Sequence, residues 1–408
     1  MVFDELKSLF QPQKRTNDDL IDRLNHHWTV LILAIFVIIT STSQYAGDPI
    51  HCWCPAEFSD SYVDYAEAAC WVENTYYIPI DEAVPVDPVP RKNAQIHYYQ
   101  WVPIILAFQA FLFKLPNIIW KMLHEYSGIN IDKVVNLADN TAVVSTKDRE
   151  KTINNLAYYV TRWLENSKQQ RQANMTKGKF SVTKWCFWNK HSGKCLTFLY
   201  LFTKLLYLLN VIGQFFLLSA FMGYPFYSLG IDFSAKAITA SSFSGITKFP
   251  RTTLCDFKIR QLSNIQTWTV QCVLSINLFN ERIFLSIWFI LILISLCTLG
   301  GLLKWVVDTF YVKTKESFVK SYLEILESTN DEKDMKLLKR FLSSFLGFDG
   351  LFILRIVSQN SSDIFAGDLT LRLWEQYKHS LDDIAPADLG VDKKSLSKMS
   401  GMDNVSEA

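Results

Sequence analysis

Four long apolar segments, separated by polar stretches, dominate the pattern of hydrophobic and polar positions along this chain. Each has roughly the ~20 residues that a helix needs to cross the ~30 Å hydrocarbon core of a bilayer. Aromatic residues flank the second segment, with Tyr98 and Trp101 at one end and Trp120 near the other, as in the interfacial belts of membrane helices. The pattern predicts a mainly α protein, a bundle of four transmembrane helices at residues 28–45, 98–123, 196–223 and 283–307.

Polar residues within these segments mark positions that lipid does not favour. Lys114 lies inside the second segment, where a cation near mid-membrane costs ~2.5–3.5 kcal/mol and is expected to face other helices or water. Pro116 lacks a backbone donor and predicts a kink, which we interpret as a gating kink, with a simple packing kink as the alternative. The first segment ends in a polar run at 40–44, which is expected to face water or another helix.

Charge predicts the orientation of the segments between the spans. Residues 46–97 hold nine acidic residues against two basic ones, whereas residues 124–195 hold twelve Lys or Arg. The positive-inside rule therefore places 124–195 in the cytoplasm, with both chain termini on the same side. The expected regions outside the bilayer are an N-terminal segment at 1–27, a first extracellular loop at 46–97, a cytoplasmic loop at 124–195, a second extracellular loop at 224–282 and a cytoplasmic helical C-terminal region at 308–408.

The cysteines agree with this orientation. Five of the eight cysteines lie in the two loops expected outside, where disulfides persist: Cys52, Cys54, Cys70, Cys255 and Cys272. Taking one pair from each loop leaves three possible pairings open and makes Cys54 either a free thiol or a competitor for a partner. A disulfide-stapled extracellular domain is expected.

Composition and motifs narrow the function. Hydrophobic residues make up 49% of the chain, which indicates membrane spans combined with large polar loops. The net charge is only +1, so the chain as a whole has no strong positive field that would attract nucleic acid. The sequence contains no Gly-rich phosphate loop, HExxH or GxSxG motif. Cys186, His191 and Cys195 offer only three potential zinc ligands at irregular spacing. No catalytic activity, cofactor or metal is expected, and a pore would require a ring of such four-helix subunits.

Four separated blocks of residues resemble the innexins, the invertebrate gap-junction proteins. The signature is Tyr98-Tyr99-Gln100-Trp101-Val102, and the other blocks are Asp48–Trp53 (DPIHCW), Phe249–Phe257 and Gln271–Phe284. The resemblance covers roughly residues 1–360. It implies homo-oligomeric rings, octameric in nematode members, in the plasma membrane, where they dock head to head at the cell junction, with copies of themselves or with other innexins.

The resemblance also implies roles for particular residues. The continuous pore of two docked rings is expected to pass ions and small metabolites. The implied disulfides are Cys52–Cys272 and Cys70–Cys255. The N-terminal segment is expected to fold into the pore as a funnel, so the implied pore-lining residues are Met1, Val2, Phe3, Asp4, Thr40, Ser41, Ser43 and Gln44.

Three other functions remain open from the sequence. One is an undocked hemichannel that releases small molecules, as in the related pannexins. Another is a four-span adhesion or scaffold protein that does not conduct. A transporter is the third, although the few embedded charges and the lack of an internal repeat do not favour it.

Overall fold

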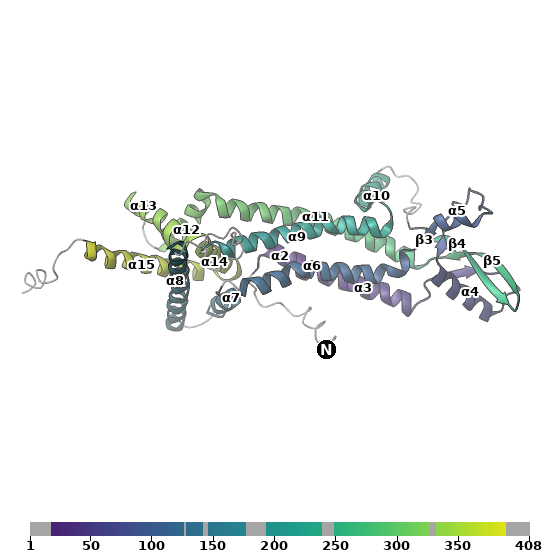
Figure 1. The fold of residues 1–408 in the computed structure, drawn as a ribbon, viewed down its shortest axis with the longest axis horizontal. Helices are drawn as coiled ribbons and strands as arrows, with labels where there is room; N and C mark the ends of the chain where they lie inside the picture. The colour runs from purple at the N-terminus through teal and green to yellow at the C-terminus, as the bar shows by residue number, and fades with distance from the viewer. Residues whose placement is uncertain are drawn as a thin grey trace, which may run out of the picture. The chain divides into compact units, whose positions relative to one another are not determined.

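A computed structural model describes residues 18–125, 128–141, 146–176, 193–238, 249–326 and 332–388. The chain is mainly helical (Figure 1) and divides into two compact units. Unit 1 comprises Leu20–Ile119 and Thr203–Leu302, and the described part of unit 2 comprises residues 18–19, Trp120–Phe202 and those after Leu302. The predicted pore-lining residues Met1–Asp4 of the N-terminal segment lie outside the described residues.

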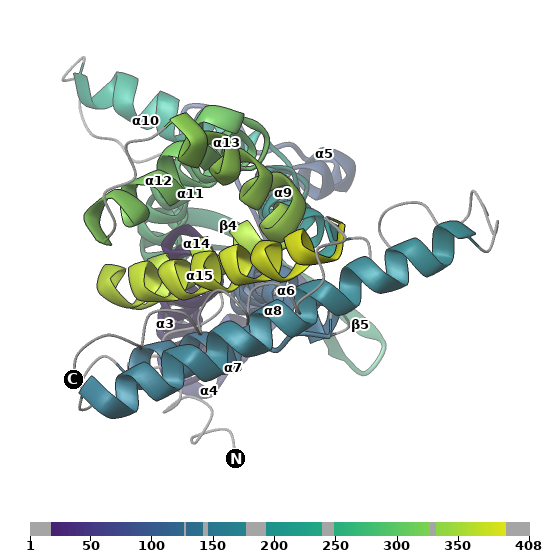
Figure 2. The ribbon, with the colours of Figure 1, turned by 90° about the vertical axis from the view of Figure 1, so that its left-hand side faces the viewer.

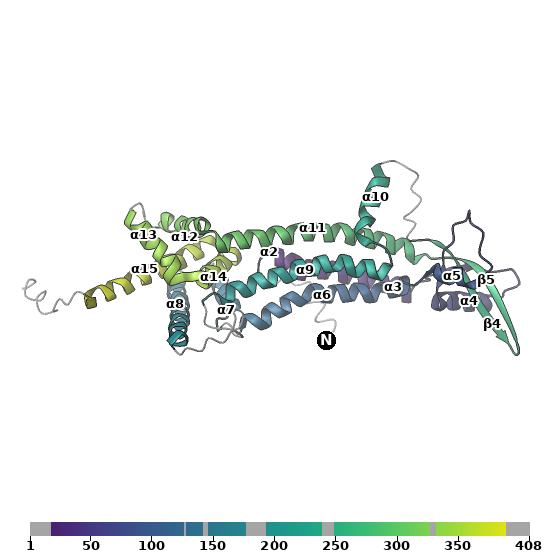
Figure 3. The ribbon, with the colours of Figure 1, turned by 45° about the horizontal axis from the view of Figure 1, so that its top comes forward.

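Long helices that run alongside one another form the body of unit 1 (Figures 1 and 3). They are the first helix, made of α2 (Leu20–Arg23), the π-helical turn η1 (Leu24–Trp28) and α3 (Thr29–Tyr45), and the helices α6 (Val102–His124), α9 (Cys195–Met222) and α11 (Ile276–Phe310). All four are long and apolar enough to cross a membrane. They overlap the four predicted spans, although α6 begins at Val102, four residues after the predicted start at 98.

The first helix begins at Leu20 rather than at the predicted Trp28. The extension is possible because its polar side chains have partners inside unit 1. Asp22 lies 2.8 Å from Nζ of Lys204 in an almost fully buried ion pair. Asn25 donates a hydrogen bond to Thr298 at 2.9 Å. A buried charge is tolerated only when it is paired in this way, and hydropathy alone does not reveal such pairs.

A five-stranded antiparallel sheet lies in unit 1, in the order β1-β5-β4-β2-β3. Its strands are β1 (His51–Trp53), β2 (Thr75–Tyr76), β3 (Gln95–Ile96), β4 (Thr252–Gln261) and β5 (Asn264–Val273). We call these strands, with helices α4 (Asp60–Glu73) and α5 (Pro88–Asn93), the sheet region. It draws strands from both predicted extracellular loops. Helix α5 begins with Pro88, since proline fits the first turn of a helix.

Two shorter elements follow α9 within unit 1. A 3₁₀ turn, η6 (Phe226–Ser228), leads into α10 (Leu229–Ile238). Trp288 of α11 donates a hydrogen bond from its indole to the Tyr227 carbonyl at 3.1 Å. Gly230 lies against the same indole, where an added Cβ would come within 2.2 Å of the ring. Glycine at this position therefore permits the close approach of α10 and α11.

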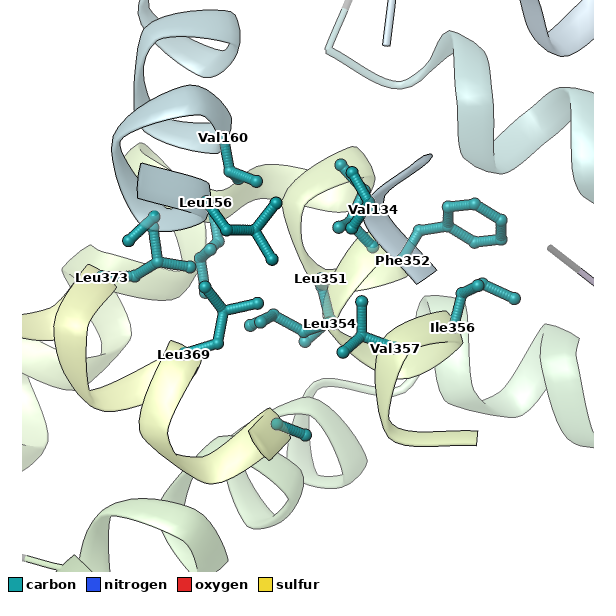
Figure 4. Close-up of a cluster of buried hydrophobic side chains, with 14 of the residues drawn as sticks. Val134, Leu156, Val160, Leu351, Phe352, Leu354, Ile356, Val357, Leu369 and Leu373 are labelled. Atoms are coloured by element: carbon teal, nitrogen blue, oxygen red, sulfur yellow. The ribbon is translucent and has the colours of Figure 1, made fainter. Parts of the chain in front are cut away.

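Unit 2 is a helical assembly with its own hydrophobic core. Beyond its parts of α6, α9 and α11, it comprises α7 (Ile131–Asn140), α8 (Thr146–Thr176), α12 (Val312–Leu326), α13 (Glu332–Arg340), the π-helical turn η7 (Phe341–Leu346), α14 (Gly347–Asn360) and α15 (Asp363–Asp388). Helix α8 packs across α15 (Figure 2). Figure 4 shows Val134 of α7, Leu156 of α8, Leu354 of α14 and Leu369 of α15 converging in the core.

A fifth apolar helical stretch, Met335–Asn360, is also long enough to span a membrane. The sequence predicts a cytoplasmic helical region here and not a further span. About two thirds of its apolar window, 67%, is buried inside the protein. It combines α13, η7 and α14, with a backbone break at Gly347, whose φ is +61°. Its apolar character therefore reflects packing in the core of unit 2.

Candidate functional site

Two disulfides join the halves of the sheet region. Cys52 of β1 is bonded to Cys272 of β5, and Cys70 of α4 is bonded to Cys255 of β4. Each bond connects the first predicted extracellular loop to the second, and these are the pairs that the resemblance implies. The sulfur atoms of Cys52, Cys70 and Cys272 lie within 4.8 Å of one another. The two bridges thus form one compact, largely buried cross-link.

Cys54 stands outside this cross-link. It is half-buried and not disulfide-bonded. Burial, with the nearby carboxylate of Glu67, raises the pKa of the Cys54 thiol above its ordinary value. Since the thiolate is the form that attacks disulfides, the raised pKa makes Cys54 a poor competitor for the partner of Cys52.

A polar cluster around Asp256 joins β2 and α5 to the central strands β4 and β5. Asp256 accepts hydrogen bonds from the Tyr76 hydroxyl at 2.9 Å and from Thr269 at 2.7 Å. Arg91 of α5 pairs with the same carboxylate at 2.8 Å. Burial and the bond to Asp256 raise the pKa of Tyr76 to about 12. The cluster ties β2, β4, β5 and α5 together. Its members are far apart in the chain, so the sequence alone does not reveal it.

The β4–β5 hairpin ends in an exposed tip. Its last cross-strand pair is Gln261 with Asn264. Leu262 is 98% exposed and has a φ of +53°, a conformation that a leucine rarely adopts. Ile265, the next apolar residue of β5, is 52% exposed. An exposed strand ribbon with apolar side chains at its tip has the character of a contact surface.

The polar end of the first helix holds four of the predicted pore-lining residues, two buried and two half-buried. Thr40 is fully buried and donates its hydroxyl hydrogen to the Phe36 carbonyl at 2.8 Å. Gln44 is also buried and donates to the Tyr99 carbonyl at 2.7 Å. These two residues lie four apart on one helix face and are covered within the subunit. The predicted pore-lining role of both stays a prediction. Ser41 and Ser43 are half-buried and remain candidates.

The tyrosine-rich signature packs at the entrance of α6 and contributes buried rings. Tyr99 is fully buried and its ring centroid lies 5.0 Å from that of Trp71 in α4. Gln100 donates a hydrogen bond to the Trp71 carbonyl. Tyr98 packs edge-on against Phe249, with ring centroids 5.7 Å apart. The signature thus fixes the sheet region to the start of α6.

The other blocks meet at the same place. Asn277 donates to the Pro250 carbonyl at 2.8 Å, and Ser275 donates to the Asp48 carbonyl at 2.9 Å. Arg251 pairs with the buried Glu281 at 3.0 Å. The four sequence blocks, although far apart in the chain, therefore form one continuous joint between the sheet region and the helices of unit 1.

Pro116 lies inside α6, which continues as a helix through it to His124. The neighbouring Lys114 is half-buried. A role of Pro116 in gating stays a prediction.

Among the described residues, the three cysteines that approach one another closely are members of the disulfides, so their grouping is no metal site.

Comparison with known proteins identifies the family of this chain. A family model described as Innexin matches residues 18–377. The chain belongs to the innexin family.

Relatives match this innexin over nearly its full length. It is 36% identical to innexin unc-9 of Caenorhabditis elegans over 365 residues, which cover 90% of the chain and 93% of the relative. It is 34% identical to innexin-19 of Caenorhabditis briggsae over 89% of the chain and 87% of the relative. Innexin-11 of Caenorhabditis elegans is 35% identical, over 89% of the chain and 79% of the relative. Innexins form gap-junction channels and are not enzymes, so this innexin is a membrane protein of a channel-forming family.

Proposed function

We propose that this innexin is a subunit of a ring in the plasma membrane that docks head to head with a ring on a neighbouring cell. The docked pair forms a wide pore that passes ions and small metabolites. The observation that carries the proposal is the sheet region, which two disulfides and the Asp256 cluster make rigid and which presents an exposed apolar tip. A rigid surface loses little conformational entropy when it binds a partner.

Four membrane crossings fit this proposal better than five. The crossings are the first helix, α6, α9 and α11, with both termini, residues 124–195 and residues 308–408 in the cytoplasm. The fifth apolar stretch is broken at Gly347 and is mostly buried in unit 2. The sheet region, built from 46–97 and 224–282, is then extracellular, where its disulfides persist.

The pore wall of the proposed ring comes from the N-terminal segment with Met1–Asp4 and from Ser41 and Ser43 of the first helix. The ring is octameric by analogy with nematode innexins, and it is made of this chain alone or mixed with other innexins. A bend at Pro116 is the proposed gating element of α6. Repeating the docking contact around the ring multiplies weak contacts into strong attachment.

Paired cells that each express only this chain test the proposal. Wild-type pairs are expected to show junctional current, and Cys70→Ser is expected to abolish it by opening the Cys70–Cys255 bridge. Leu262→Asp places a charge at the hairpin tip and is expected to abolish junctional current without reducing the amount of protein at the surface. Val72→Asp, at an apolar residue that is 71% exposed on α4, is the matched control.

Each alternative function has its own outcome in this experiment. Current across single-cell membranes without junctional current would replace docking by the hemichannel function. Cell adhesion with no current in either arrangement would indicate the scaffold function. Junctional current that persists at wild-type level in Leu262→Asp would remove the hairpin tip from the docking surface.

A further inference from the structure

A cavity in unit 2 combines an aromatic wall with lysines from separate elements. Its volume is about 830 Å³, within the range of sites for drug-sized ligands. The end of α8, the residues just before α9, the start of α12 and the turn η7 all contribute to it. We call this cavity the lysine pocket. The π-helical backbone of η7 is a local irregularity of the kind that often accompanies a binding site.

Three lysines of the pocket are held over aromatic rings. Nζ of Lys168 lies 5.1 Å from the ring centroid of Phe345. Nζ atoms of Lys194 and Lys315 lie 5.1 Å and 4.0 Å from the ring centroid of Phe348. Cation–π contacts of this length orient the ammonium groups without neutralising them. The pocket therefore presents three positioned cations beside an apolar surface.

Nearby acids offset the charge of these lysines only in part: burial lowers the pKa of Lys168, and the carboxylate of Glu165 opposes that shift. Within the part of the chain that the structure describes, none of the three forms an ion pair. The one acid that lines the pocket, Glu316, lies 4.0 Å from a fourth lysine, Lys339. Burial, with the charges of Arg355 and Lys194, lowers the pKa of Lys315. An anion that entered the pocket would relieve this repulsion between like charges.

The position of the lysines along the chain indicates where the anion comes from. Lys194 immediately precedes α9, and Lys315 lies in α12, shortly after the end of α11 at Phe310. Both α9 and α11 are apolar enough to cross a membrane. Basic residues at the ends of membrane helices lie at the level of lipid headgroups and attract anionic lipids. The aromatic wall also suits a ligand that is partly apolar.

We propose that the lysine pocket binds the phosphorylated headgroup of an anionic membrane lipid. The phosphates accept hydrogen bonds from Lys168, Lys194 and Lys315, and the first apolar atoms of the lipid rest against Phe345 and Phe348. Lysine binds phosphate as a point charge, so the site selects for charge and for an attached apolar group. Binding at this site requires neither docking nor conduction.

The test uses the purified full chain in detergent. The probes are dioctanoyl phosphatidylinositol bisphosphate, its free headgroup inositol trisphosphate, and dioctanoyl phosphatidylcholine, with affinity measured by thermophoresis. The anionic lipid is expected to bind, and the other two probes are expected to bind at least about tenfold more weakly. Lys194→Gln/Lys315→Gln is expected to weaken binding of the anionic lipid by about tenfold or more.

Two control variants make the result specific to the pocket. Lys313→Gln/Lys320→Gln removes two lysines of the same helix α12 that do not line the pocket, and it is expected to leave affinity within about twofold of wild type. Lys194→Arg/Lys315→Arg keeps the charge and is expected to retain binding. If the double Gln variant fails to fold, Lys194→Gln and Lys315→Gln are measured singly, with about a threefold loss expected from each.

Three results would overturn the proposal. Equal losses in the pocket variant and the α12 control would mean general attraction to a basic surface. Binding of inositol trisphosphate as tight as that of the lipid would assign the pocket to a soluble phosphate. No measurable binding of the anionic lipid by the folded wild-type chain would remove the site altogether.

Discussion

The two disulfides are nested, and this predicts how much stability each one contributes. Cys52–Cys272 spans 220 residues of sequence and Cys70–Cys255 spans 185. Once either bridge is closed, the other closes a loop of only about 35 residues, those of 52–70 and 255–272, because the first bridge already joins the distant parts. The perturbation is to replace both cysteines of one bridge by alanine, which removes the bond without leaving either partner as a new free thiol.

The magnitude follows from the entropy of loop closure. A loop of about 35 residues corresponds to about 4 kcal/mol, and the long loop alone corresponds to about 5 kcal/mol. Cys70→Ala/Cys255→Ala and Cys52→Ala/Cys272→Ala are therefore each expected to destabilise the sheet region by about 4 kcal/mol, since the remaining bridge still closes the long loop. Removing both bridges is expected to cost about 9 kcal/mol.

The loss of stability in each variant is measured by amide hydrogen exchange of β4 and β5 in the purified full chain. Hydrogen exchange reports the free energy of local opening. Cys54→Ala is the matched control and is expected to leave exchange unchanged. The reasoning would be refuted if removing both bridges cost no more than removing one. A much larger loss from Cys70→Ala/Cys255→Ala would also refute it, because Cys70 and Cys255 are both fully buried whereas Cys52 is half-buried. Packing would then outweigh loop closure.

Three further predictions concern single side chains. Lys204→Met leaves Asp22 buried without its cation and is expected to cost about 3–5 kcal/mol in thermal unfolding, with recovery when Asp22→Leu is added. Because its pKa is raised, Cys54 is expected to react with maleimide more slowly than a free cysteine near neutral pH, with the rate rising about tenfold per pH unit until the pKa is reached. Because the pKa of Tyr76 is higher in the folded than in the unfolded chain, Tyr76 contributes stability at pH values below its unfolded pKa. This stability is lost as the pH rises through about 12. The melting temperature of wild type is thus expected to fall more steeply above pH 10 than that of Tyr76→Phe, and parallel curves would contradict the assignment.

The apolar segments predicted the long helices because burial in lipid and helical length both follow from local composition. The start of the first helix was not predicted, since Asp22 reads as a polar break until its partner Lys204, far away in the chain, is placed beside it. The fifth apolar stretch was not predicted either. Its hydrophobic residues pack in the core of unit 2, and this burial depends on helices that are distant in the chain.

The sheet was also missed, although a signal was present. Thr253, Cys255 and Phe257 alternate with more exposed residues in β4, and Val270 and Cys272 do so in β5. This period of two is typical of a strand with one buried face. The exposed half of the hairpin shows no such alternation, so the segment as a whole resembles a polar loop. Cys52 pairs with Cys272 because the sheet places β1 beside β5, which spacing along the chain cannot indicate.

The interleaved strand order of the sheet imposes an order of events on biosynthesis. Strands β1, β2 and β3 are made first, but β1 pairs only with β5 and β2 needs β4 to join the rest of the sheet. Cys52 and Cys70 therefore leave the ribosome well before Cys272 and Cys255 are made, and the unpaired Cys54 leaves with them. Until residues near Cys272 are synthesised, these thiols are open to premature pairing with one another. Correct maturation of this innexin thus depends on keeping early cysteines reduced, or on reshuffling them, until the second half of the sheet arrives.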